Sequence, residues 1–365
     1  MRGQAKSYFI VGNTAKGPHS LFDSAYSNVK SLYVLTGGPG TGKSAIIRNL
    51  ANTMQERGWD VELYHSSLDS EDLDGMIVAG LQAGLIDGTA CPEALQSGVG
   101  NTLEVFDLDE AVDRNLLQAD ESRMSELQQE IEHWYNKAID TYNKGLQIHD
   151  EWEKIYIDNM DHAAADRITR ELADSLFGVR KDSKPAKVIH RYLGAATSRG
   201  PVDFIMPLTE GLPRRIFVKG RPGSGKSTMM KKLAAEAERQ GYDVEMFHCG
   251  FDPNSLDMLI FPDINVAIFD STAPHEHFPS RAGDEILDMY EKTFPPGIDE
   301  KYADSIAEIR ARYTSAMSEA NACLAKVKSL RDEWKRLYRK GVDSAKVAEI
   351  ESRIRGAFEK QVHKI

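Results

Sequence analysis

Two glycine-rich segments of this sequence have the residue types and the spacing of a phosphate-binding loop. The first is Gly37-Gly-Pro-Gly-Thr-Gly-Lys-Ser44 and the second is Gly220-Arg-Pro-Gly-Ser-Gly-Lys-Ser227. Glycines let the backbone turn so that successive N–H groups point inward and surround phosphate oxygens. The positive N-terminal end of a following helix strengthens such a site. Both segments are therefore predicted to hold a polyphosphate.

Each loop is accompanied by groups that could hold a metal ion. The apolar runs Ala83-Gly-Leu-Ile-Asp87 and Val266-Ala-Ile-Phe-Asp270 are predicted strands that end in an aspartate. A carboxylate at the carboxyl end of a neighbouring parallel strand can bind Mg²⁺, together with the serine hydroxyl at the end of the loop. An aspartate that only caps a buried strand is the structural alternative. The predicted magnesium ligands are Ser44, Asp87, Ser227 and Asp270.

Both loops follow the pattern G-x-x-x-x-G-K-[ST] between a predicted strand and a predicted helix, and in this the sequence resembles the P-loop NTPases. The resemblance covers the front half of each repeat described below. It implies that Lys43 and Lys226 reach the β- and γ-phosphates and act in catalysis. It further implies nucleotide contacts from Gly37, Pro39, Gly40, Thr41, Gly42, Lys43, Ser44 and Ala45, and from Gly220, Pro222, Gly223, Ser224, Gly225, Lys226, Ser227 and Thr228.

Residues near the loops bear on which branch of this superfamily the sequence resembles. Enzymes of the ABC and AAA type usually carry Glu directly after the strand-end aspartate, whereas Gly88 and Ser271 stand there. A guanine-reading Asn-Lys-x-Asp signature is incomplete at 143–146, which lacks the aspartate, so ATP is favoured over GTP. The loops look like those of small-molecule kinases and also of some AAA proteins.

Four further residues are candidates for the reacting groups. His65 and His248 stand at the predicted ends of equivalent strands, with Asp69 and Asp252 four residues later. Ligands of open α/β sheets bind outside the carboxyl ends of the strands. In nucleotide and shikimate-like kinases a carboxylate near this point holds or deprotonates the acceptor, which the resemblance carries to the two aspartates, with the histidines as partners. The alternative, that these residues merely cap the strand and the next helix, stays open.

Other polar residues near the loops have weaker assignments. Lys16 and Arg199 share an aligned position and are the best candidates for an early loop over the nucleotide. His275 and His277 occur only in the second half, and three roles stay open for them: a place near the γ-phosphate, a metal site, or ordinary polar residues of a loop. Arg221 stands where the first loop has Gly38, so the two sites are expected to differ chemically.

The chain contains an internal repeat. A shift of 183 residues superposes the two loops and pairs Glu62 with Glu245, and a shift of 182 pairs Trp152 with Trp334. Self-similarity of this kind indicates a duplicated structural unit. The predicted modules are residues 1–180 and 181–365, with a polar, basic linker near residue 180.

Strands that alternate with helices predict an α/β fold in which a parallel sheet is covered on both faces, giving two tandem three-layer P-loop modules. Behind each front half, apolar residues recur every three or four positions through 124–155 and 306–337. This spacing predicts a helix of roughly 50 Å at 1.5 Å per residue. A shorter amphipathic helix follows each one, so a helical hairpin is predicted over about 120–178 and about 302–360.

Composition excludes several classes of protein. The 365 residues are 41% hydrophobic and 28% charged, which excludes wholesale disorder. No apolar run approaches the ~18–20 residues of a membrane helix, and the net charge of -11 argues against a nucleic-acid coat. Three scattered cysteines and no secretory h-region predict a cytoplasmic setting.

These observations predict an ATPase with two Mg·ATP sites whose hydrolysis is coupled to a partner or process outside the sequence. One alternative is a small-molecule or nucleotide kinase with its acceptor near Asp69 or Asp252. Another is a nucleotide-gated interaction protein whose hairpins bind a partner protein and whose hydrolysis is slow. The duplication also suggests an intramolecular pseudo-dimer in which each site supplies residues to the other.

Overall fold

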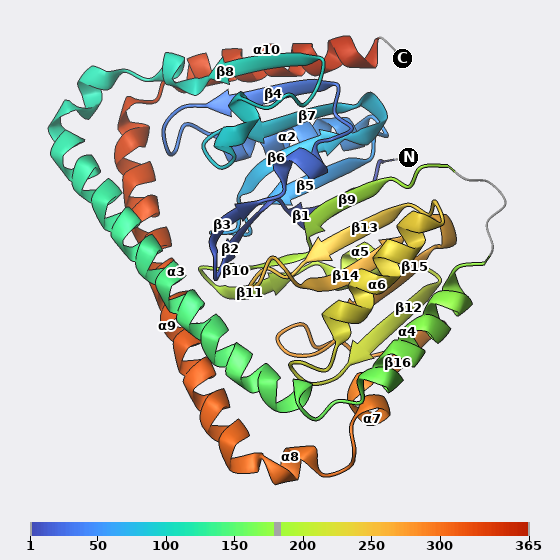
Figure 1. Cartoon of the computed structure of the whole chain (residues 1–365). Helices are drawn as coiled ribbons and strands as arrows, with labels where there is room; N and C mark the ends of the chain where they lie inside the picture. The colour runs from blue at the N-terminus through green and yellow to red at the C-terminus, as the bar shows by residue number, and fades with distance from the viewer. Residues whose placement is uncertain (1, 179–183, 364–365) are drawn as a thin grey trace.

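The computed structural model describes residues 2–178 and 184–363 and has an α/β fold built on one large sheet (Figure 1). The predicted linker near residue 180 falls on residues 179–183, outside the described part of the chain. The sheet has twelve strands. Its first six strands in space come from the second half of the chain and its last six from the first half.

The first half contributes strands in the spatial order β1-β5-β6-β7-β4-β8. Their bounds are β1 (Ala5–Phe9), β4 (Ser31–Thr36), β5 (Val61–His65), β6 (Leu73–Val78), β7 (Ala83–Asp87) and β8 (Thr102–Asp107). The second half repeats this order as β9-β13-β14-β15-β12-β16. Their bounds are β9 (Val188–Tyr192), β12 (Arg214–Lys219), β13 (Val244–His248), β14 (Leu256–Phe261), β15 (Val266–Asp270) and β16 (Asp284–Asp288).

The sheet is mixed, so the predicted purely parallel sheet is wrong. Strand β6 runs antiparallel to both β5 and β7, and β14 runs antiparallel to β13 and β15. The reason is the length of the connections. Residues 66–72 and 249–255 are too few for the crossover of a dozen or more residues that a parallel return needs, so the chain folds straight back.

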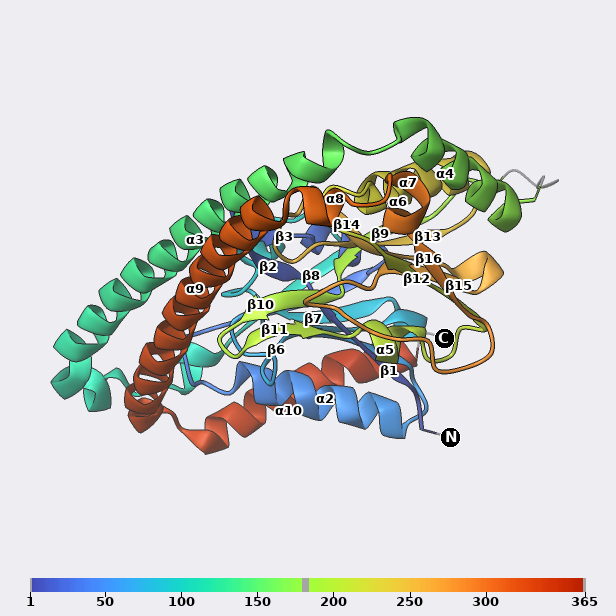
Figure 2. The same cartoon turned by 90° about the horizontal axis from the view of Figure 1, so that it is seen from below.

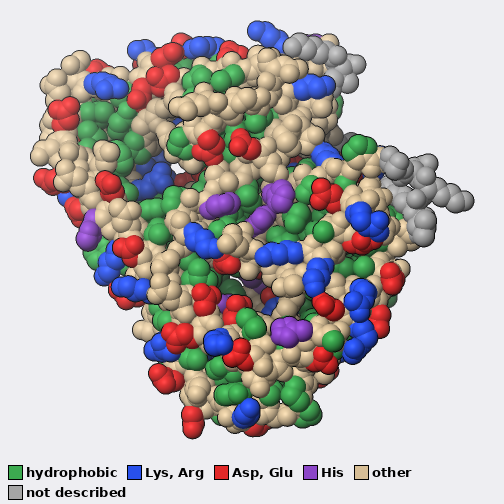
Figure 3. Space-filling model, in the orientation of Figure 1, with side chains coloured by type: hydrophobic (Ala, Val, Ile, Leu, Met, Phe, Trp, Pro, Cys, Tyr) green, Lys and Arg blue, Asp and Glu red, His purple; other side chains and the backbone are tan. Residues whose placement is uncertain are grey.

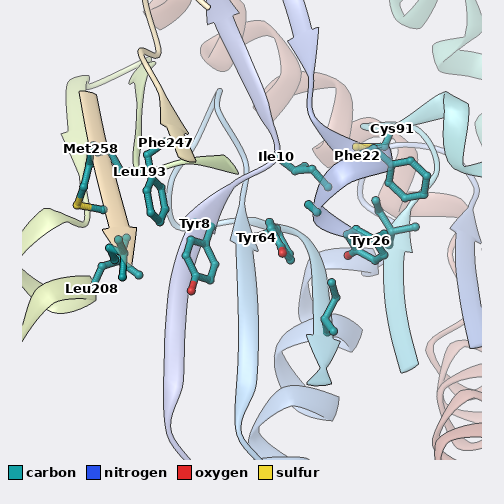
Figure 4. Close-up of a cluster of buried hydrophobic side chains, with 14 of the residues drawn as sticks. Tyr8, Ile10, Phe22, Tyr26, Tyr64, Cys91, Leu193, Leu208, Phe247 and Met258 are labelled. Carbon is teal, nitrogen blue, oxygen red and sulfur yellow. The ribbon is translucent and has the colours of Figure 1, made fainter. Parts of the chain in front are cut away.

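The two halves join edge to edge at β1 and β9, which pair antiparallel through Phe9 and Tyr192. One buried cluster continues across this seam, as Figure 4 shows. Within it the ring of Tyr8 lies 5.7 Å from that of Tyr64 and 6.1 Å from that of Phe247, which belongs to the second half. The halves therefore share a core as well as a sheet.

A buried arginine joins the halves beside Tyr8 of this cluster. Arg191 on β9 is only 2% exposed, and its guanidinium donates to both carboxylate oxygens of Glu62 at 2.6 Å. It also lies 3.4 Å from Glu245 and 4.3 Å from the centre of the Tyr8 ring. Glu62 and Glu245 are equivalent in the repeat, and so are Tyr8 and Arg191. One cation thus serves a glutamate from each half.

Helices cover the sheet. In the first half α2 (Lys43–Glu56) packs on one face and α1 (Phe22–Ala25) on the other. The side chains of β4 alternate between them: Leu32 and Val34 pack in the cluster of α1, and Tyr33 and Leu35 in the cluster of α2. In the second half α6 (Lys226–Arg239) and α5 (Ile205–Thr209) take these places. This alternation follows from the two-residue period of a strand.

The two long helices are present as predicted, but they form no hairpins. Helix α3 (Glu121–Ile157) packs along α9 (Ala303–Tyr338), the long helix of the other half (Figure 2). After α3, helix α4 (His162–Leu176) packs on α6 and α7 (Met289–Thr293) of the second half. The short helix α8 (Ile298–Lys301) precedes α9. After α9, helix α10 (Ser344–Val362) packs on the first half, where the Tyr33 hydroxyl donates to the carbonyl of Ala357.

Small residues lie where the two long helices meet. Ala138 and Gly145 of α3 and Ala320 and Cys323 of α9 are buried where the two helices meet. Small side chains let two helix axes approach closely. The apolar stripe that predicted a hairpin is therefore one side of a contact between helices from different halves.

None of the helices in residues 2–178 and 184–363 combines the length and the apolar character that a membrane crossing requires.

Replacing Arg191 with Met should lower the free energy of unfolding by about 3–5 kcal/mol, because two half-buried glutamates, one from each half, lose the cation between them. Urea denaturation followed by circular dichroism measures this. The control is Arg312→Met, which removes an exposed ion pair with Glu151 between α3 and α9 and should change stability far less. Equal losses in the two variants would contradict the role given to Arg191.

Candidate functional site

The two glycine loops, residues 37–44 and 220–227, each connect a strand to the helix that covers it. The first runs from β4 to α2 and the second from β12 to α6. The helices begin at Lys43 and Lys226, directly after Gly42 (φ 100°) and Gly225 (φ 82°). This left-handed backbone is open to glycine and unfavourable for other residues. The sequence pattern therefore places both lysines in the first turn of a helix.

The lysines fold back over their own loops. The Nζ atom of Lys43 donates to the carbonyls of Gly37 (2.5 Å) and Gly38 (3.2 Å) and lies 3.8 Å from Asp87. The Nζ atom of Lys226 donates to the carbonyl of Arg221 at 3.0 Å and lies 3.5 Å from Asp270. Burial lowers the pKa of Lys43, against the opposing effect of Asp87. Each half therefore holds a lysine ammonium that bonds to the loop's own backbone and lies beside a strand-end carboxylate.

The serines and aspartates expected to bind a metal lie near these lysines. The hydroxyls of Ser44 and Ser227 accept from the backbone N–H of Leu73 (2.9 Å) and Leu256 (3.0 Å). Asp87 and Asp270 end strands that run parallel to the loop-bearing strand, opposite its last residues. Each aspartate also accepts a hydrogen bond from a nearby threonine, Thr89 or Thr272.

A second carboxyl group in each half lies beside the first, and sequence reasoning gave it no role. Asp74 and Asp257 are buried near the start of β6 and β14. These strands pair with β7 and β15, which end in Asp87 and Asp270. Burial and repulsion from Asp87 raise the pKa of Asp74 to about 7. Burial raises the pKa of Asp257 to about 6, with Asp270 adding to the rise and His275 opposing it. The repeat already aligned these aspartates, but without the antiparallel strands nothing placed them at the loops.

The predicted histidines lie inside the sheet and are held by other residues. The Nδ1 of His65 contacts the carbonyl of Ser70 at 2.5 Å, and its Nε2 contacts the hydroxyl of Ser7 at 3.1 Å. His248 contacts the carbonyl of Pro253 at 2.7 Å and the ring nitrogen of His190 at 2.8 Å. Burial lowers the pKa of both imidazoles. These contacts match the structural reading of the two histidines.

The predicted acceptor aspartates are paired with cations from the opposite half. Asp252 lies 2.8 Å from Lys16, at the tip of the hairpin of β2 (Val11–Thr14) and β3 (Gly17–Ser20). Asp69 lies 3.5 Å from Arg199, at the tip of the hairpin of β10 (Gly194–Thr197) and β11 (Gly200–Asp203), and 3.1 Å from Lys328. Lys16 and Arg199 were expected over a nucleotide. The structure places each in a reciprocal contact between the halves.

The ends of the exchanged helices cover the loops. Near the end of α3, Glu153 accepts from the backbone N–H of Gly223 at 3.2 Å, and a Cβ at Gly223 would lie 2.5 Å from the carbonyl oxygen of Glu153. Near the end of α9, a Cβ at Gly40 would lie 2.7 Å from the carbonyl oxygen of Lys335. These two glycines therefore also make room for a helix from the other half.

The two sites differ at the position predicted to differ. Tyr338 of α9 occupies the space beside Gly38, where a Cβ would come within 2.1 Å of its ring. Its hydroxyl donates to Asp109, which also accepts from the N–H of Gly38. At the equivalent place Arg221 extends away and pairs with Asp299 at 2.8 Å. Tyr156, the equivalent of Tyr338, also donates to Asp299 at 2.9 Å, so the second loop holds an arginine paired with that aspartate where the first loop holds a glycine packed against the ring.

A cavity of about 1120 Å³ lies over the second loop. Its lining includes the predicted residues of that loop together with Asp252, Asp257 and Asp270. Figure 3 shows a recess in this part of the surface, with acidic and basic side chains at its rim. The predicted loop residues of the second half are thereby brought together around one space, whereas His248 does not line it.

A histidine found only in the second half also lines the cavity. His275 contacts Asp203 at 3.0 Å through Nδ1, and its Nε2 lies 4.0 Å from Asp257. His277 contacts the other oxygen of Asp203 at 3.2 Å. Although burial opposes it, the hydrogen bond to Asp203 together with the neighbouring carboxylates raises the pKa of His275.

Comparison with known proteins finds no match: no family model, no curated protein and no solved structure is similar to this chain.

Asp74→Asn should stabilise the protein at alkaline pH and have little effect in acid. The pKa of Asp74 rises from 3.8 in the unfolded chain to about 7 on folding, so the folded state binds the proton more tightly and wild-type stability falls as pH rises through this interval. At pH 8 the variant should gain about 1–3 kcal/mol, which is less than the full value of roughly 1.4 kcal/mol for each unit by which the pKa is raised. At pH 4 the two proteins should be nearly equal.

Urea denaturation at pH 4, 6 and 8 measures the difference. Asp257→Asn is the matched comparison in the second half and should reach its full gain at lower pH, because the pKa of Asp257 is about 6. A stability difference between Asp74→Asn and wild type that does not change with pH would refute the assignment.

Proposed function

We propose that this protein is a P-loop NTPase that binds Mg·ATP at both glycine loops and hydrolyses it in support of another process. The observation that carries the proposal is the same in both halves. A glycine loop leads from the strand next to an edge of the sheet into a helix, and the first-turn lysine lies within 4 Å of an aspartate on a neighbouring strand. Backbone N–H groups at a helix N-terminus and a nearby ammonium are suited to bind a polyphosphate.

The donor set near each loop fits a magnesium ion. Hydroxyl and carboxylate oxygens are the ligands that Mg²⁺ prefers, usually one or two carboxylates with water and phosphate oxygens. Ser44 and Asp87 would hold the ion in the first half, and Ser227 and Asp270 in the second. The bound ion would neutralise charge on the phosphates. Repulsion from Asp87 contributes to the raised pKa of Asp74, and a bound cation would reduce this repulsion between the two carboxylates.

Contacts between the halves support coupling of the two sites within one pseudo-dimer. Helix α3 begins in the first half and ends on the second loop, and α9 runs in the opposite sense. A change at the second loop therefore acts on α3, and α3 packs along α9, which covers the first loop. The apolar stripes of these helices are used in this contact, which weakens the proposal of free hairpin arms for a partner protein.

A kinase activity is the second candidate, favoured by the cavity over the second loop. Its volume of about 1120 Å³ exceeds the ≈ 300–1,000 Å³ usual for small-molecule pockets, which leaves room for an acceptor beside a nucleotide. Asp252 and His275 line it and could accept a proton from an acceptor hydroxyl.

Lys43→Ala and Lys226→Ala should each remove one ATP site, and the double variant should remove both. The loss of the ammonium should weaken binding at the altered loop by about 100-fold, or about 2.7 kcal/mol. Isothermal titration calorimetry with ATP and Mg²⁺ reports affinity and stoichiometry together. Lys144→Ala, on an exposed position of α3, is the control and should bind like wild type.

Unchanged ATP binding by the double variant would refute the proposal. Phosphate release and phosphoryl transfer to a metabolite panel, measured on the same protein, separate the two candidate activities. Transfer without appreciable release into water would favour the kinase.

A further inference from the structure

The cavity over the second loop has an aromatic wall that the proposed phosphate site does not use. Four of its lining residues, His149 and Trp152 of α3, Tyr313 of α9 and Phe251 of the 249–255 connection, form what we call the aromatic wall. The Tyr313 ring centre lies 5.7 Å from that of His149 and 6.2 Å from those of Trp152 and Phe251. These are the spacings of rings in mutual contact.

The wall adjoins the second loop. Glu153, next to Trp152 in sequence, contacts the backbone N–H of Gly223. The charge on Lys226 acts on the imidazole of His149, as do those of Asp150, Glu153 and Asp252. None of the four residues of the wall is fully buried, and all four line the cavity. A ligand in the cavity can thus touch the loop and the wall together.

The first loop has other residues at the equivalent positions. The repeat pairs His149 with Arg331, Tyr313 with Ile131 and Phe251 with Leu68; only the tryptophan is kept, as Trp334. Leu146, which also lines the cavity, is paired with Lys328. Because these pairs stand at equivalent positions of α3, α9 and the two connections, the backbone does not require either chemistry. The second loop is therefore accompanied by rings where the first is accompanied by cations and aliphatic side chains.

We propose that the aromatic wall binds the planar ring of an organic ligand, beside the phosphate site and at the second loop only. Rings stack on aromatic side chains through their faces, and a half-enclosed aromatic cavity with a few polar groups is a typical site for such a molecule. The ring could be the base of the bound nucleotide or belong to a separate molecule. This inference concerns the wall and holds whether or not ATP is hydrolysed.

The test uses the full chain and the uncharged fluorescent dye N-phenyl-1-naphthylamine, whose lack of charge avoids attraction to the lysines. The dye should bind one site per chain. His149→Arg combined with Tyr313→Ile installs the residues found at the first loop and should weaken dye binding at least tenfold. The equivalent helix positions already hold these residues, which makes the variant compatible with folding. Trp152→Ala should also weaken binding, and Trp334→Ala, its counterpart at the first loop, should not.

Competition then identifies the source of the ring. Displacement by Mg·ATP but not by inorganic tripolyphosphate assigns the wall to the nucleobase. Displacement by neither assigns it to a separate ligand, and Lys226→Ala should leave dye binding intact in that case even if ATP binding is lost. Displacement by tripolyphosphate, absence of a single dye site, or equal binding by the His149→Arg, Tyr313→Ile variant would overturn the proposal.

Discussion

The arrangement of this molecule depends on one buried cation at the seam of its sheet. Arg191 is held between Glu62 of the first half and Glu245 of the second, with the ring of Tyr8 beneath it. Charges buried in this way must be paired, because desolvation makes an isolated one unfavourable. The pairing therefore requires both halves to be present and in register, and it makes two similar units into one continuous sheet.

That seam sets the geometry in which the long helices exchange. With the halves fixed edge to edge, α3 can begin beside the first half and end on the loop of the second, while α9 takes the reverse course. Neither glycine loop is then completed by its own half alone. Glu153 reaches the second loop and the carbonyl of Lys335 approaches the first, and the reciprocal pairs of Lys16 with Asp252 and Arg199 with Asp69 bind the hairpins to the opposite half.

Duplication followed by exchange also explains how two similar sites came to differ. The residues of the two glycine loops are nearly the same, whereas several of those that the exchanged helices bring to them differ. His149 and Glu153 stand at the second loop where Arg331 and Lys335 stand at the first. Single substitutions on α3 or α9 can thus change one site without disturbing the sheet, because the helices contact the loops only near their ends.

The local pattern of the sequence determined the glycine loops, the helices that follow them, the strand-end aspartates Asp87 and Asp270 and the length of α3 and α9, since each depends on backbone preferences within a few residues or turns. Partners distant in the chain were decided only by tertiary structure. An apolar stripe on a helix does not specify which surface covers it. Hairpins were predicted within each half, whereas α3 and α9 pack on each other. Likewise Asp74 and Asp257 reached the loops only because two short connections forced their strands to run antiparallel.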